Sequence, residues 1–305
     1  MKKIRQQFAE TVLKIGKKDK NIVVMVGDIS HGIMQPFAKN NPRRYFNIGI
    51  CEPAMVNVAA GISKMGLIPI VHTITPFLIE RSFEQIKLDF GYQKLPVNLV
   101  SVGDTFDYSK LGCSHHSYSD LAIMSQFNNS QFVYPGSAEE FDILFNQAYR
   151  QKKINYFRIS DFSHSFKFSK NKIKLGKGIK FQKGKDLTII CTANFLNDAN
   201  LVSENLKKEK KTTEIIYLHT IKPIDKNLII KSVKKTKKVL ILDKFNFHSG
   251  LANICINLLK DLRNIKIESI SINDFIHDYG SYENLKNKAG FSQKNIMLKI
   301  SKLFR

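Results

Sequence analysis

Strand-length apolar runs alternate with segments of helical periodicity along almost the whole chain of 305 residues. This alternation is typical of βαβ units, in which parallel strands form a sheet and the intervening helices cover both of its faces. In the first half, the candidate strands are residues 22–26, 45–48, 67–71, 97–102, 131–134 and 155–159, and the candidate helices are 5–15, 52–64, 77–90 and 138–150. We therefore expect an α/β fold built on a mostly parallel sheet.

A change of composition divides the chain. Residues 166–186 are rich in Lys, Ser and Gly, which favours a linker or an exposed meander. A second alternating unit follows, with candidate strands at 187–192, 214–218, 239–243 and 265–272 and candidate helices at 196–208, 226–235, 250–261 and 292–303. Because the length also suits two domains, we predict two consecutive mostly parallel-sheet α/β domains, residues 1–165 and 187–305, joined by the linker 166–186.

The chain is strongly basic, with 48 Lys and Arg against 26 Asp and Glu and a formal net charge of +22. Such a charge can mark a nucleic-acid-binding surface. Here the lysines are spread over the whole chain, together with many Asn and Ile, and do not cluster with aromatic residues. We therefore interpret the charge as a solvated basic surface and expect no specific nucleic-acid partner, although such a surface would suit phosphorylated substrates or an acidic partner subunit.

Nothing in the sequence indicates a membrane or a secretory protein. A spanning helix needs about 18 or more consecutive apolar residues, and no such run exists. The first twenty residues resemble an amphipathic helix more than a signal peptide. The cysteines are far apart and show no metal-type or redox-type spacing, so we expect a reduced, cytoplasmic protein; they are Cys51, Cys113, Cys191 and Cys255.

A single carboxylate, Glu52, stands where a short strand runs into a helix, in the segment NIGICEPAMVNVAAG of residues 47–61. An acidic residue at a helix N-terminus has an ordinary explanation, since it complements the helix dipole. The small residues that follow indicate that another element packs tightly against this helix; they are Ala54, Ala59, Ala60 and Gly61.

The same segment resembles a motif of the transketolase family, whose pyrimidine-binding domain carries GIAEQ-x-M-x-x-x-AAG-x-A. Further family motifs follow in the family's order. They are F-x-x-R-A-[FY]-D-Q-[IV] at 77–86, Q-x-L-P-V at 93–97, G-x-[ST]-H-Q at 112–116, [EF]-D-L-A at 119–122 and T-I-K-P-[LI]-D at 220–225, with a strand and turn at 239–243 and 249–251. The ordered set spans roughly residues 5–303, and from it the chain is identified as a member of this family.

The resemblance implies a thiamine diphosphate site. In the family, the glutamate that matches Glu52 hydrogen-bonds N1′ of the aminopyrimidine and activates the cofactor, which requires a buried carboxyl. By position, Phe77 with Ile74 beside it would supply the apolar wall on which the aminopyrimidine stacks, although ordinary core packing also explains Phe77. Asp28 matches an acidic residue near the cofactor pocket and the subunit contact, and a turn or helix cap explains it equally well.

The resemblance also implies contacts with substrate. His115 matches a family histidine that faces the substrate, and His116 stands where the family often has Gln. Arg81 matches an arginine near the phosphate end of some substrates. In the family pattern R-x-[SP]-R, Arg158 is kept but the second arginine is replaced by Asp161. We therefore expect an acceptor that is unphosphorylated, nucleotide-linked or otherwise modified, because the usual bidentate grip on phosphate is missing.

The resemblance implies Mg²⁺ on the cofactor's diphosphate, held by a G-D-G motif and a later Asn. Residues 103–105 with Asn128 and Asn129 mimic that pattern, but the second glycine is absent and the stretch already belongs to the pyrimidine-binding domain. We assign no metal ligand to this chain. The resemblance therefore implies a separate N-terminal subunit that carries the diphosphate and Mg²⁺ site, around a homodimer core or in an α2β2 assembly. The initial Met and the C-terminal domain favour a natural subunit.

These expectations describe the C-terminal subunit of a thiamine-diphosphate-dependent, transketolase-like enzyme that transfers a two-carbon ketol unit between sugars. The alternatives are a condensation of a 2-oxo acid with an aldehyde, as in 1-deoxy-D-xylulose-5-phosphate synthase, the beta subunit of a 2-oxo-acid dehydrogenase, and a non-catalytic scaffold subunit. The motifs at 77–86 and 220–225 favour the transketolase branch over the dehydrogenase branch. The presence of Glu52 and His115 argues against a scaffold.

Overall fold

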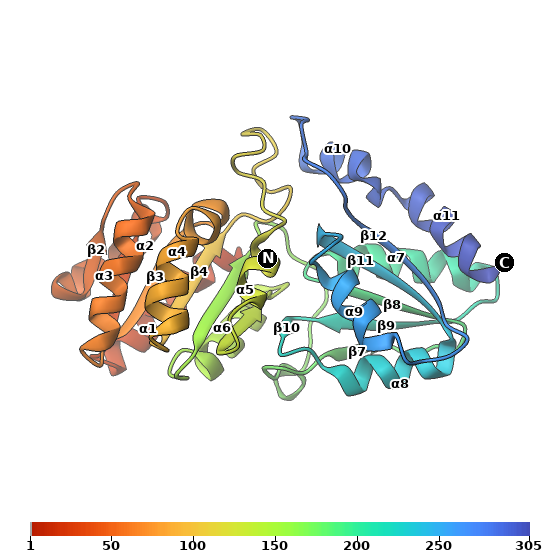
Figure 1. Cartoon of the computed structure of the whole chain (residues 1–305), viewed down its shortest axis with the longest axis horizontal. Coiled ribbons are helices and arrows are strands. Elements are labelled where there is room, and N and C mark those ends of the chain that lie inside the picture. The colour runs from red at the N-terminus through yellow and green to blue at the C-terminus, as the bar shows by residue number, and fades with distance from the viewer. Residues whose placement is uncertain (1) are drawn as a thin grey trace.

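The computed structural model describes residues 2–305, which form two α/β domains lying side by side (Figure 1). The first domain is built on a seven-stranded sheet with the order β10-β5-β6-β4-β3-β1-β2. All neighbouring strands are parallel except β10, which pairs antiparallel with β5. The strands are β1 (Ile22–Val26), β2 (Tyr45–Asn47), β3 (Ile68–Ile74), β4 (Val97–Val102), β5 (Ser130–Val133), β6 (Ile154–Ile159) and β10 (Thr220–Lys222).

Helices cover both faces of this sheet because alternate side chains of each strand point to opposite faces. On β1, for example, Val24 packs in one apolar cluster, whereas Val23 and Met25 pack in the other. The first layer contains α1 (Ile4–Lys18), α2 (His31–Asn40) and α6 (Ala138–Ala148), and the second contains α3 (Glu52–Lys64), η2 (Pro76–Glu80), α4 (Phe83–Gln85), η3 (Ile86–Tyr92) and α5 (Asp120–Ser125), with the short turn η1 (Pro42–Arg44) beside β2.

The second domain has a five-stranded sheet with the order β12-β11-β8-β9-β7, parallel except for β7 at one edge. Its strands are β7 (Ile179–Gln182), β8 (Leu187–Thr192), β9 (Thr213–Leu218), β11 (Lys238–Asn246) and β12 (Lys266–Ile272). Its helices are α7 (Phe195–Lys208) and α11 (Gln293–Phe304) on one face, α8 (Lys226–Thr236) and α9 (Leu251–Leu259) on the other, and the shorter η4 (Lys170–Lys172), α10 (Tyr282–Lys286) and η5 (Asn287–Phe291).

The predicted fold class is confirmed, and the bounds of β1, β4, β8 and α3 coincide with the predicted ones. Two differences concern how the domains are connected. The predicted linker 166–186 contains β7, whose Ile179 is buried because it pairs antiparallel with β9. The short strand β10 follows β9 in sequence but joins the sheet of the first domain. Thus β7 gives the predicted linker regular structure, and β10 links the second domain to the sheet of the first.

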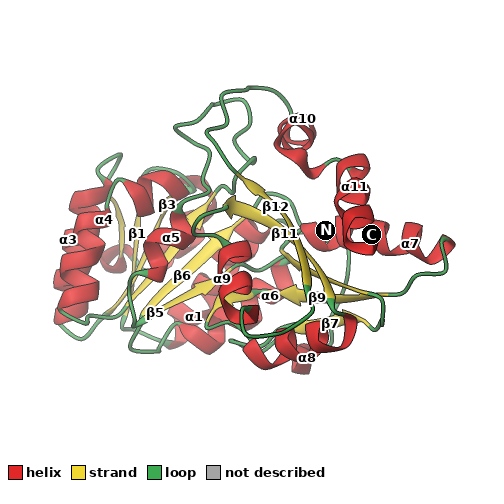
Figure 2. Cartoon of the chain, turned by 45° about the vertical axis from the view of Figure 1, so that its right-hand side comes forward, coloured by secondary structure: helices red, strands yellow, loops and turns green. Residues whose placement is uncertain are grey.

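The loops that follow β4 and β12 also hold the two domains together. They lie next to each other in both views (Figures 1 and 2), and the Gly280 N–H donates a hydrogen bond to the Ser109 carbonyl at 3.1 Å. Below them, the amide of Asn246 donates to the carbonyl of Tyr118 at 2.9 Å. The loop that carries the predicted histidines is therefore fixed by the second domain.

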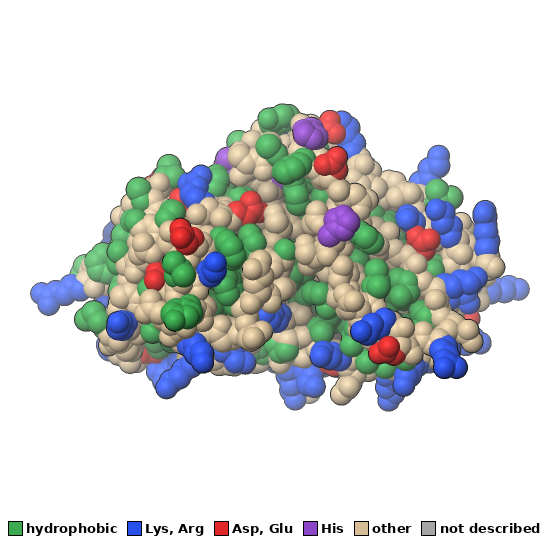
Figure 3. Space-filling view, in the orientation of Figure 1, with side chains coloured by type: hydrophobic (Ala, Val, Ile, Leu, Met, Phe, Trp, Pro, Cys, Tyr) green, Lys and Arg blue, Asp and Glu red, His purple; other side chains and the backbone are tan. Residues whose placement is uncertain are grey.

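The surface is basic without a continuous basic stripe on the face shown in Figure 3, where Lys and Arg side chains are scattered along the lower and outer margins. None of the helices in residues 2–305 is both long and apolar enough to cross a bilayer. The four cysteines are unpaired, two exposed and two buried.

Candidate active site at the carboxyl edge of the first sheet

The predicted site residues follow strands of the first sheet at the edge where parallel strands end. Asp28 follows β1, Glu52 follows β2 and Phe77 follows β3. The chain places β2 on one side of β1 and β3 on the other, so the direction of strand addition reverses at this point. Ligands of open α/β sheets bind outside the carboxyl ends of the strands at such a reversal.

Glu52 lies in the first turn of α3 and is only 1% exposed. The Thr73 hydroxyl on β3 lies 3.4 Å from one carboxylate oxygen, Oε1. Arg81 donates from Nη1 to the other oxygen, Oε2, at 2.7 Å. A buried carboxylate is costly unless it is paired and hydrogen-bonded. The ion pair with Arg81 therefore offsets the cost of burying the Glu52 carboxylate in this chain.

Phe77, Arg81 and His115 form a contiguous group next to Glu52. The guanidinium carbon of Arg81 lies 4.2 Å from the centre of the Phe77 ring. The His115 ring meets Phe77 edge-on at 5.0 Å between centres, and its Nδ1 lies 3.0 Å from the Ser114 hydroxyl. Burial, and then the positive charge of Arg81, lower the pKa of His115, which keeps the imidazole neutral near pH 7.

A wide helical turn places Arg81 over Phe77. In the family pattern two residues separate the phenylalanine from the arginine, whereas three do so here. The structure absorbs this extra residue in η2, a π-helical turn in which the Arg81 N–H donates to the Pro76 carbonyl at 3.0 Å. Such π-helical turns are rare and are found frequently at functional sites. The predicted continuous helix 77–90 is accordingly replaced by η2, α4 and η3.

Two other predicted residues lie at the margin of this group. Ile74 is the last residue of β3 and is half-buried. Asp28 is exposed, adopts a left-handed backbone with φ of 65°, and accepts a hydrogen bond at 3.3 Å from the side-chain amide of Asn47. Their predicted contacts with the cofactor stay predictions.

The structure corrects the predicted substrate contact of His116. This residue is 3% exposed, and neither ring nitrogen has a hydrogen-bond partner or surface access among the described residues. The adjacent His115 faces the group around Phe77 instead. His115 closes a turn, since its N–H donates to the Gly112 carbonyl at 3.0 Å, and the sequence does not say which of the two neighbouring histidines the turn leaves at the surface.

The predicted substrate contact of Arg158 is likewise wrong, since this residue is fully buried. Arg158 pairs with Asp120 at 2.8 Å and donates to the Ser117 carbonyl at 2.7 Å. It therefore supports the loop behind His115 and has no route to a substrate.

Sequence reasoning missed a buried cluster at the domain interface. Lys244 on β11 forms an ion pair with Asp104, which also accepts a hydrogen bond from Tyr134 at 2.6 Å. The Thr105 hydroxyl lies 2.6 Å from the Lys244 carbonyl oxygen. Asp104 of the G-D-T segment is therefore completely buried and engaged by these partners. The two charges are 140 residues apart in sequence, and no local signal relates them.

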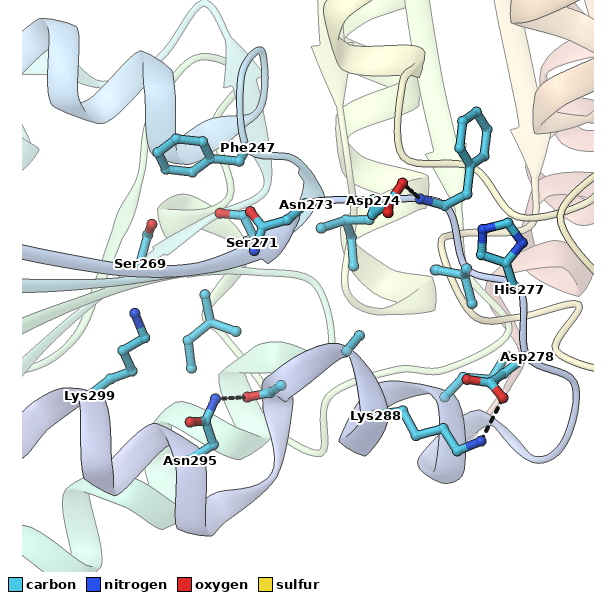
Figure 4. Close-up of a pocket in the computed structure, with 17 residues that line it drawn as sticks. Phe247, Ser269, Ser271, Asn273, Asp274, His277, Asp278, Lys288, Asn295 and Lys299 are labelled. Atoms are coloured by element: carbon cyan, nitrogen blue, oxygen red, sulfur yellow. Dashed lines mark hydrogen bonds and ion pairs between the residues drawn. The ribbon is translucent and has the colours of Figure 1, made fainter.

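A separate hollow of about 550 Å³ lies in the second domain, around the end of β12 (Figure 4). Its basic residues are already paired, Lys288 with Asp278 at 2.6 Å and Lys299 with Glu268 at 2.9 Å. The predicted catalytic residues are not among its lining residues. Among residues 2–305, no group of three His, Cys, Asp or Glu side chains is placed to hold a metal ion.

Comparisons with known proteins agree on the class. Residues 1–161 match the family model "Transketolase, pyrimidine binding domain", and residues 176–296 match "Transketolase, C-terminal domain". The chain is similar to the 6-deoxy-6-sulfo-D-fructose transketolase subunit SqwH of Clostridium sp. (strain MSTE9), with 26% identity over 96% of this chain and 92% of that protein. It is also similar to the 1-deoxy-D-xylulose-5-phosphate synthase of Halothermothrix orenii, with 28% identity over 90% of this chain but only 44% of that protein.

A solved structure described as "Split gene transketolase, inactive beta4 tetramer" superposes with a TM-score of 0.89, at 26% identity, over 98% of this chain and 97% of that one. The fold is thus an α/β domain that matches the pyrimidine-binding family model, followed by a second α/β domain that matches the C-terminal model. The chain belongs to the transketolase family. The predictions of the family and of a transketolase-like transferase subunit are confirmed.

Proposed function

We propose that this chain is the C-terminal subunit of a thiamine-diphosphate-dependent enzyme that transfers a two-carbon ketol unit between sugars. The observation that supports this most directly is the buried carboxylate of Glu52 at the carboxyl edge of the sheet, where Arg81 contacts both this carboxylate and the Phe77 ring. When bound, thiamine diphosphate supplies the electron sink for breaking and forming carbon–carbon bonds.

The residues of this chain would bind and orient the aminopyrimidine ring and the sugar substrate. Glu52 would share a proton with N1′ of the aminopyrimidine, which its burial favours because a shielded carboxyl forms a strong hydrogen bond. Phe77 would hold the plane of the ring, with Ile74 beside it and Asp28 at the outer margin. His115, neutral because of its lowered pKa, would donate or accept at a sugar oxygen through Nε2.

The diphosphate and Mg²⁺ are assigned to a separate N-terminal subunit. Support comes from the absence of a metal-binding cluster among residues 2–305 and from relatives whose printed names describe a transketolase subunit and a split gene. A homodimer core completed as α2β2 would place each half-site against a partner subunit. We also propose a cytoplasmic location, consistent with the four unpaired cysteines.

The test of this function is purification from native lysate and identification of any chain that co-elutes stoichiometrically. The reconstituted pair, with thiamine diphosphate and Mg²⁺, is then assayed with ketose donors and aldose acceptors. Transfer of a two-carbon unit without release of CO₂ supports the proposal. Release of CO₂ from pyruvate would favour the synthase alternative, which the similarity to 1-deoxy-D-xylulose-5-phosphate synthase keeps open. A chain that elutes alone and gives neither reaction in any mixture would favour a scaffold.

A prediction about the acceptor follows from Asp161. Its N–H donates to Asp107 at 2.8 Å, and it stands where the family motif has a second arginine. We expect unphosphorylated or otherwise modified acceptors to be preferred over ordinary aldose phosphates. The D161R variant should gain roughly 10- to 100-fold in kcat/KM for an aldose phosphate, because charge-assisted hydrogen bonds contribute about 1.5–3 kcal/mol. D161N is the control for loss of the negative charge alone, and a wild-type preference for aldose phosphates would contradict the prediction.

A further inference from the structure

Arg81 makes the same two contacts that the proposed function assigns to the aminopyrimidine. Its guanidinium lies 4.2 Å from the centre of the Phe77 ring, and its Nη1 donates to Glu52 Oε2 at 2.7 Å. A guanidinium and an aminopyrimidine are both planar, both stack on aromatic faces, and both present N–H donors in their plane. One side chain thus reproduces the shape and the hydrogen bond of the expected ring.

The physical reason lies in the burial of Glu52. The carboxylate is 1% exposed, and its only other hydrogen bond within the described residues is the long contact with Thr73 at 3.4 Å. Without a cation at Oε2, a charged and nearly dry carboxylate would destabilise the chain. Arg81 therefore stabilises the half-site in a subunit that has no cofactor.

A ring that enters this place meets Arg81 first. The Arg81 side chain is 43% exposed, whereas Glu52 lies beneath it. Oε2 is occupied by Nη1, and Oε1 faces the buried Thr73. The ring can reach the carboxylate only if Arg81 leaves Oε2, and its partial exposure gives the guanidinium an outward path into solvent.

We propose that Arg81 is an internal stand-in for the aminopyrimidine, which occupies Glu52 in the free subunit and must swing outward before the cofactor binds. The inference rests on the proposed function, since it takes the aminopyrimidine as the competing ligand. It makes Arg81 a residue that controls loading: if the closed arrangement predominates about ten to one, the apparent affinity for the ring falls about tenfold. The subunit is thereby kept stable and poorly loaded until the ring competes.

The experiment uses the isolated full chain and thiamine, which carries the aminopyrimidine but no diphosphate and so does not need the Mg²⁺ site. The measurement is the shift of the melting temperature with thiamine concentration, since a ligand that binds only the native state stabilises it by mass action. Saturation-transfer NMR gives the same affinity without unfolding. We expect R81A to bind thiamine about tenfold more tightly than the wild type, and R81A/E52Q to lose that gain.

The control is R263A, which removes an exposed arginine of the second domain and should leave thiamine binding at the wild-type level. R81Q, which keeps a planar neutral side chain, serves if R81A does not fold. Wild-type binding as tight as that of R81A would overturn the proposal, because Arg81 would then assist the ring. Absence of binding to every Arg81 variant would also overturn it. Neither result decides the proposed function, which two-carbon transfer by the assembled pair tests separately.

Discussion

Replacing Glu52 by Gln is expected to lower kcat of the reconstituted enzyme by about 10²–10⁴-fold, the range attributed to a positioned acid–base group. Gln keeps the size of the side chain and its hydrogen-bonding capacity, but it cannot hold or release the proton shared with N1′. Because Glu52 is only 1% exposed, a water molecule cannot easily take over the role of the missing carboxyl in the variant. The measurement is steady-state two-carbon transfer at saturating cofactor, together with cofactor affinity.

The matched control is E84Q on the neighbouring helix α4, where the side chain is exposed. We expect E84Q to behave as wild type, and circular dichroism should show that both variants are folded. A nearly unchanged kcat for E52Q would contradict the assignment of Glu52. A loss confined to KM at unchanged kcat would assign Glu52 to binding alone.

The sequence predicted those parts of the fold that depend on local pattern. The predictions of β1 and α3 are correct because β1 consists of five consecutive apolar residues, as a buried strand does, and because the apolar residues of α3 recur with the period of a helix. The edge strands β7 and β10 were missed, since each pairs with a strand distant in sequence and carries little apolar signal of its own. Helix α5 was too short to be read from periodicity.

The candidate site likewise has features that local motifs predict and features that depend on tertiary contacts. Residues carried by a motif, Glu52, Phe77 and His115, come together in space, with Phe77 and His115 in edge contact. The ion pair between Arg81 and Glu52 depends on an inserted π-helical turn that the motif does not contain. The direction of His116 and the burial of Arg158 depend on contacts with loops elsewhere in the chain. Motifs thus predict which residues are candidates for the site, and tertiary packing decides which of these candidates are accessible to a ligand.

Replacing Lys244 by Met is expected to destabilise the chain by about 3–5 kcal/mol, the usual cost of removing one partner from a buried ion pair. Lys244 and Asp104 are both fully buried between the two domains. Met preserves most of the volume of the lysine stem but leaves the Asp104 carboxylate without its nearest cation. The measurement is the free energy of unfolding in urea, with K234M on the exposed face of α8 as the control.

A double variant distinguishes the interaction between Asp104 and Lys244 from the contacts that each residue makes with its other neighbours. In D104N/K244M both charges are absent, so we expect most of the lost stability to return, with a coupling free energy in the double-mutant cycle at least as large as the stability regained. Additive losses would mean that the two side chains stabilise the interface independently. Asp104 belongs to the loop that leads to His115, and K244M removes its ion pair, so K244M should also raise KM for the substrate.

The pH dependence of stability provides a further test of the ion pair between Lys244 and Asp104, and the direction of the expected change can be derived. Burial alone would raise the pKa of Asp104, but the charges of Lys244 and Arg158, and the hydrogen bonds from Lys244 and Tyr134, outweigh it and lower the pKa below its ordinary value. A lowered carboxyl pKa contributes stability above the unfolded pKa, about 3.9, which is lost as the pH falls toward the folded value. In K244M the burial of Asp104 is no longer offset by the lysine, which favours its protonated form. The difference in stability between wild type and K244M should therefore shrink as the pH is lowered from 7 toward about 4, and a difference that is constant over this range would show that the charge of Asp104 is not what Lys244 stabilises.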